Sequence, residues 1–197
     1  MGSSIFHFPF TISGLMPWYE LAKLVHIIGL ITLIGFFVVY TRIRITFASA
    51  KTTREAQQLV AMLDASRRML PAGSALLLIS GIIMTGMRWR SPYAFPIGGL
   101  VTLLVITPVA MSVLKKQIAT IRTTLGSGDA GISDAMRAAI STARQWGLMM
   151  ACNLAAVGVV LIMTLKPGWM FVTGVLVVFP VFGYYLGASM AEKARLR

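Results

Sequence analysis

The segment that decides the fold is Leu24–Thr41, which reads LVHIIGLITLIGFFVVYT and contains no charged residue. A transmembrane helix needs about 20 mostly apolar residues to cross the roughly 30 Å hydrocarbon core of a bilayer. The apolar segment extends on both sides to about residues 18–47. A membrane-spanning β-strand is only about 10 residues long and alternates in polarity, so this segment predicts a helix.

Four further apolar segments of similar length follow, at about residues 69–87, 91–114, 145–165 and 167–191. The 197 residues are 57% hydrophobic and only 12% charged, whereas roughly a quarter of the residues in a soluble domain are charged. The composition therefore excludes a water-soluble domain. We predict a single all-α membrane domain over residues 1–197, a bundle of five transmembrane helices with a four-helix core plus one.

The basic residues predict how the chain is oriented. Of the 18 lysine and arginine residues, six lie within 42–68, five within 115–144 and three in the C-terminal tail. Because basic residues favour the cytoplasmic side, the N-terminus is expected outside and the C-terminus inside. Attraction to anionic lipid explains the net charge of +12, so the bilayer is the expected partner and nucleic acid is not. The expected location is the cytoplasmic (inner) membrane of a bacterium.

The first cytoplasmic segment, about residues 52–66, has its own helical pattern. Thr52 and Glu55 match a capping box, in which each residue satisfies a backbone N–H of the other. Apolar residues follow at helical spacing, and they are Leu59, Val60, Met62 and Leu63. This pattern predicts a short amphipathic helix on the inner surface of the membrane.

His26 is the most informative polar residue within the spans, because polar groups there are costly and suggest function. Counting residues from the helix ends puts Gly29, Gly81 and Gly158 at about the same depth. Three glycines would leave space beside an imidazole for a flat macrocycle, although close helix packing also uses small residues. Three roles stay open for His26: a haem-iron ligand, a hydrogen-bonded structural residue and a proton relay.

Two other features suggest contacts between helices. Asn153, within the fourth span, predicts a hydrogen bond between helices. Gly183 and Gly187 form a small-xxx-small pattern that could mediate a homodimer. The chain has one cysteine and two histidines, and it shows no paired intramembrane carboxylates and no phosphate-binding glycine loop. Hydrolase and kinase chemistry therefore has no basis here, and no catalytic residue is predicted.

Three short motifs resemble a broad group of small bacterial membrane proteins. They are WYELAKLVHIIG at residues 18–29, RRMLPAG at 67–73 and MTLKP at 163–167. The group includes the HemJ-type membrane protoporphyrinogen oxidases, the CopD-like copper-resistance domains and uncharacterised predicted integral membrane proteins. The resemblance covers about residues 18–167. It implies haem binding through the first-helix histidine, here His26, and for the oxidases an oxidoreductase activity.

The sequence thus favours a b-type haem-binding membrane protein with a redox or haem-handling role. In this hypothesis haem b is held by His26 as the metal ligand, with Gly29, Gly81 and Gly158 beside it. A redox partner in the membrane is then expected. The first alternative is a non-catalytic scaffold or subunit of a membrane complex, and the second is a transporter of a small solute or metal.

Overall fold

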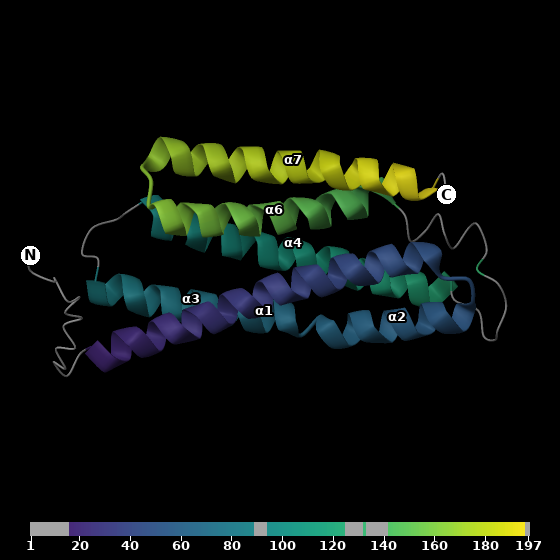
Figure 1. Cartoon of the computed structure of the whole chain (residues 1–197), viewed down its shortest axis with the longest axis horizontal. Coiled ribbons are helices and arrows are strands. Elements are labelled where there is room, and N and C mark those ends of the chain that lie inside the picture. The colour runs from purple at the N-terminus through teal and green to yellow at the C-terminus, as the bar shows by residue number, and fades with distance from the viewer. Residues whose placement is uncertain (1–15, 89–93, 125–131, 133–141, 196–197) are drawn as a thin grey trace, which may run out of the picture.

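The structure is a computed structural model that describes residues 16–88, 94–124, 132 and 142–195. Within these residues the chain forms helices and no β-strand, as Figure 1 shows. The helices are α1 (Met16–Ser49), α2 (Thr53–Ser66), α3 (Met69–Arg88), α4 (Ala94–Thr124), α6 (Ala143–Leu165) and α7 (Trp169–Arg195). Five helical segments of the described chain are long and apolar enough to cross a membrane, which confirms the predicted all-α membrane fold.

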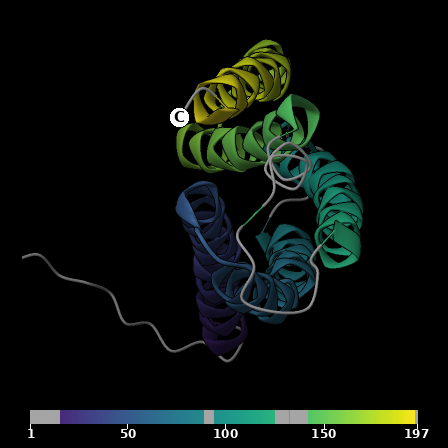
Figure 2. The same cartoon turned by 90° about the vertical axis from the view of Figure 1, so that its right-hand side faces the viewer.

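Four of the spanning helices, α1, α3, α4 and α6, surround the larger core, since α1 also contacts α6, and α7 packs on the outer side of α6. Figure 2, viewed along the bundle, shows the order α1, α3, α4, α6 and α7. The closest pairs are α1 with α3 and α6 with α7, while α4 connects the two pairs chiefly through α6. Small residues allow these close approaches, because two helix backbones can come close together only where no bulky side chain separates them.

The larger core lies between α1, α3, α4 and α6. Its most deeply buried members include Phe36, Phe37, Leu70, Leu114 and Met149. A second, smaller cluster joins α7 to α4 and α6. This division matches the predicted four-helix core plus one. Apolar side chains such as those of Ile31, Ile82 and Val105 are exposed on the outside of the bundle, as expected for a surface covered by lipid.

The predicted amphipathic helix exists, but its position differs from the expectation. The Thr52 hydroxyl accepts from the Glu55 N–H at 3.3 Å, and the Glu55 carboxylate accepts from the Lys51 N–H at 2.8 Å. Figure 1 shows α2 continuing almost in line with α3 instead of crossing the bundle. Its apolar side, including Val60 and Leu63, packs against the ends of α1 and α4. Burial against these helices replaces the predicted burial in lipid.

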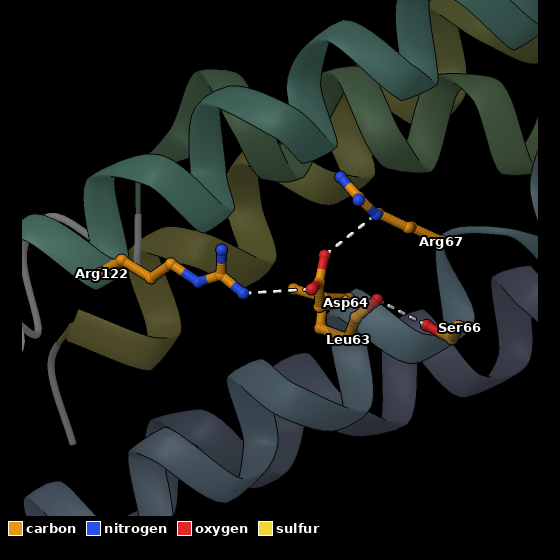
Figure 3. A network of polar contacts seen from close by, with 5 residues as sticks. All are labelled: Leu63, Asp64, Ser66, Arg67 and Arg122. Atoms are coloured by element: carbon orange, nitrogen blue, oxygen red, sulfur yellow. Dashed lines mark hydrogen bonds and ion pairs between the residues drawn. The ribbon is translucent and has the colours of Figure 1, made fainter.

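The lengths of α1 and α4 explain why α2 packs against their ends. At 1.5 Å per residue, the 34 residues of α1 span about 50 Å and the 31 residues of α4 about 46 Å. Both exceed a hydrocarbon core of roughly 30 Å, so each extends beyond it at one end. There α2 completes a small three-helix extension. Figure 3 shows its polar connection, in which Asp64 of α2 pairs with Arg67 at 2.9 Å and with Arg122 of α4 at 3.0 Å.

Candidate functional site

His26 lies on α1 and contacts α3. Its Nδ1 is 3.0 Å from the hydroxyl oxygen of Ser80, which is 1% exposed. The Ser80 hydroxyl itself donates to the Leu76 carbonyl one turn earlier, so its oxygen accepts from the imidazole N–H. In a neutral imidazole this pairing leaves the lone pair on Nε2. The arrangement therefore joins two helices and leaves one nitrogen as an acceptor.

Only one of the three predicted glycines lies against the imidazole. A side-chain carbon added at Gly81 would lie 3.6 Å from His26 Cε1. At Gly29 the same addition would lie 2.9 Å from the backbone nitrogen of Leu77, so α3 already fills that space. At Gly158 it would meet Val175 of α7 at 2.9 Å. Gly29 and Gly158 therefore serve close packing between helices, the alternative that the sequence left open, and Gly29 does so in the same α1–α3 contact as His26.

These contacts do not fit a haem enclosed between helices at the depth of His26. The α1–α3 backbones meet near Gly29 and Gly73, where no macrocycle can enter. Two of the hollows, of about 500 and 250 Å³, lie on α7 and between α4, α6 and α7, away from His26. Within the described part of the chain, no group of three or more His, Cys, Asp or Glu residues could hold a metal ion.

The other two predicted contacts also differ in the structure. The Gly183 and Gly187 face is used within the chain, because added side-chain carbons there would meet the α6 backbone at Met150 and Trp146. Gly183 and Gly187 are therefore already used in the contact between α6 and α7 of one chain. Asn153 is half-buried on α6, and within the described residues its side chain forms no hydrogen bond to another helix.

A second polar cluster, which we call the Arg44 cluster, lies near the other end of α1. It consists of Tyr40 and Arg44 of α1, Gln117 of α4 and Trp146 of α6. Arg44 and Gln117 are each 1% exposed. The Arg44 guanidinium carbon lies 4.7 Å from the centre of the Trp146 ring and 6.0 Å from that of Tyr40. Such distances allow cation–π attraction, which is stronger where water is excluded.

Gln117 bridges the two polar residues of α1. The Tyr40 hydroxyl and the Gln117 amide are 2.9 Å apart. With the amide nitrogen turned toward Tyr40, the amide oxygen accepts from Arg44 Nε at 3.3 Å and also contacts Nη1. Arg44 Nη2 is buried and has no hydrogen-bond partner, and the same holds for Trp146 Nε1. The cluster thus satisfies one edge of a buried cation and leaves the other edge open.

Sequence reasoning missed Arg44 because it counted the residue among the exposed basic groups of the first cytoplasmic segment. The signal that could have identified it is its spacing on α1. Phe36, Phe37, Tyr40 and Phe47 recur at intervals of three and four, and Arg44 falls on the same side. A basic residue on the most aromatic side of a helix is expected to be buried with it.

Further polar contacts also join different helices. Thr107 of α4 donates to Ser74 of α3 at 2.8 Å. Together with His26–Ser80 and Tyr40–Gln117, this contact connects α1, α3 and α4 at three positions along the bundle. Side-chain hydrogen bonds of this kind are a general means of holding transmembrane helices together.

No known protein family, no curated protein and no solved structure matches this chain. The resemblance to the HemJ-type and CopD-like proteins therefore remains a hypothesis based on the short motifs alone.

Proposed function

We propose that this chain is a structural membrane protein, a scaffold or subunit of a membrane complex, in which the polar residues of the spans hold helices together. The observation that carries the proposal is the His26–Ser80 hydrogen bond at 3.0 Å. It gives the most conspicuous polar residue of the sequence a role within the fold. The contacts Ser74–Thr107 and Tyr40–Gln117 use other polar residues in the same way.

Haem binding through His26 is the second candidate, and one observation favours it. With Nδ1 paired to Ser80, Nε2 is the nitrogen left to hold iron, and a second hydrogen bond of this kind orients many metal-binding histidines. The α1–α3 contact leaves no enclosed, glycine-lined space beside His26, so a haem bound to Nε2 would have to lie outside that contact.

Spectroscopy and stability on one preparation separate the two candidates. The scaffold proposal expects protein purified in detergent to be colourless and to show no specific Soret shift with haemin. It also expects His26→Leu to lower the free energy of unfolding by about 1–2 kcal/mol in haem-free protein, through a lost hydrogen bond and lost packing on Gly81. A Soret band that His26→Ala abolishes would replace the scaffold proposal with the haem one.

The distribution of basic residues supports the finer topology. We propose that the N-terminus is outside and that the C-terminus, α2 and the ends of α1 and α4 are cytoplasmic, in a bacterial inner membrane. In Figure 1 the C-terminal end of α7 lies at the same end of the bundle as α2.

A further inference from the structure

From the Arg44 cluster we infer a binding site for a phosphate group at the end of the bundle that contains α2. The site is formed by the buried, unpaired Nη2 of Arg44, the unpaired indole N–H of Trp146 and the first turn of α6. This inference does not depend on the His26–Ser80 contact that carries the scaffold proposal, because Arg44 and Trp146 lie at a different depth.

The first step is the energetic cost of Arg44. A charged group taken out of water is strongly destabilising unless it is paired. Arg44 is 1% exposed, and its Nη2 has no hydrogen-bond partner. The described ion pairs join Glu20 to Lys23 and Asp64 to Arg67 and Arg122, so none of them supplies a counter-charge to Arg44. Gln117 and the two aromatic rings are neutral, so within the described residues nothing compensates the positive charge of Arg44.

The second step is the set of donors beside the guanidinium. Trp146, whose ring lies over Arg44, has a buried indole N–H without a partner. Thr142 lies four residues earlier, on the same side of α6, and its buried hydroxyl has no partner either. It is the N-cap residue, yet its side chain makes no capping hydrogen bond, and the first turn of α6 contains no acidic residue. An uncapped helix N-terminus attracts an anion through its free N–H groups and its dipole.

The third step is the choice of ligand. A planar guanidinium forms paired hydrogen bonds with oxyanions, and phosphate offers several acceptor oxygens to the remaining donors. Trp18 and Arg44 are 26 positions apart, about 39 Å along a helix, against a hydrocarbon core of roughly 30 Å. With Trp18 at one interface, Arg44 lies at the headgroup level of the opposite leaflet. The phosphate could belong to a lipid headgroup or to a free solute.

The test uses the full chain, delipidated in detergent, with thermal unfolding as the readout. The probes are inorganic phosphate against chloride at equal ionic strength, and short-chain phosphatidic acid against diacylglycerol with the same chains. We expect a phosphate-bearing probe to raise the unfolding midpoint and its partner without phosphate not to do so. A response to both phosphate probes indicates a free solute, and a response to the lipid alone indicates a headgroup.

Two variants with the same loss of charge provide the matched comparison. Arg44→Gln should weaken the apparent affinity for the effective probe at least tenfold, because the ion-paired hydrogen bonds are lost. Arg42→Gln changes an exposed arginine two positions away and should leave the affinity unchanged. Equal responses in the two variants, or no response in the wild type, would overturn the proposal.

Further variants keep the proposal testable if Arg44→Gln does not fold. Trp146→Phe retains the ring over the guanidinium but removes the indole N–H, and it should weaken binding of the effective probe severalfold. The double variant Asp129→Asn with Asp134→Asn tests whether a carboxylate of the chain itself pairs with Arg44. Both positions lie outside the described residues. If that double variant lowers stability only when Arg44 is present, an internal carboxylate occupies the site, and the phosphate proposal is wrong.

Discussion

Gly29 of α1 and Gly73 of α3 set how closely these two helices approach each other. A side-chain carbon at Gly29 would lie 2.9 Å from one backbone atom of α3 and 3.1 Å from another. Backbone atoms cannot move aside as the end of a flexible side chain can. Gly29, which was predicted to make room for a cofactor, therefore lets the backbones of α1 and α3 fill that space.

We predict that Gly29→Ala lowers the free energy of unfolding by about 1–3 kcal/mol, the usual cost of overpacking. Gly86→Ala, on α3, provides the control, because no atom lies within 4 Å of the added carbon. It should leave stability unchanged or raise it slightly, because alanine favours the helix. Thermal unfolding in detergent measures both. Equal effects of the two substitutions would contradict the close contact at Gly29.

The residue scale also shows where sequence reasoning ends. It could identify His26, because a histidine in an 18-residue uncharged segment is conspicuous. It could not say that Ser80 is the partner, since that depends on how α1 and α3 are rotated against each other. Arg44 was missed because counting charges by segment ignores its position on the aromatic side of α1. Its burial comes from Trp146 and Gln117, which are distant in sequence, and a tally of charge by segment cannot register them.

At the scale of the helix, hydropathy predicted the spans well where lipid determines their ends. The second span, predicted at about 69–87, is observed as Met69–Arg88. The third, predicted to end near residue 114, continues to Thr124. Lys115 and Lys116 marked its exit from the membrane, but the helix extends further because Ile118 and Ile121 pack in the core that α2 shares. Packing between helices outside the bilayer leaves no trace in a hydropathy profile.

The pairing of α6 with α7 yields a prediction about Gly183. Its added side-chain carbon would lie 2.6 Å from the Met150 carbonyl oxygen, so Gly183→Ile should separate the two helices and lower the unfolding midpoint. The yield of any crosslinked dimer should not fall in proportion to the unfolding midpoint, because the Gly183 face already packs against α6. Crosslinking and thermal unfolding on the same samples test this prediction. A lost dimer with unchanged stability would restore the intermolecular interpretation.

The attachment of α2 to α4 yields another prediction. Asp64→Asn removes the charge that holds both Arg67 and Arg122. Because the arginine side chains are about half exposed, the loss of stability should be small, about 1 kcal/mol or less. Amide hydrogen exchange should nevertheless accelerate in α2 while the spans are unaffected. High salt should reproduce part of this effect in the wild type. Unchanged exchange in α2 would show that its apolar contacts alone hold it.

For the molecule as a whole, the bilayer explains composition, exposure and charge together. Apolar side chains cover the outside of the bundle, and basic residues concentrate in the segments that follow alternate spans. We therefore predict that reporter fusions after residue 197 and within 125–131 are active only as cytoplasmic reporters, and that a fusion at the N-terminus is active only as an external one. Opposite signals at the two cytoplasmic positions would contradict a five-span topology.

The central claim is that His26 holds two helices together through Ser80. A double-mutant cycle with His26→Leu and Ser80→Ala, measured by unfolding of haem-free protein, tests it most directly. We predict a coupling energy of about 0.6 kcal/mol, the average for hydrogen bonds between transmembrane helices, and of about 1.7 kcal/mol at most. Strictly additive effects, with no coupling between the two substitutions, would contradict it.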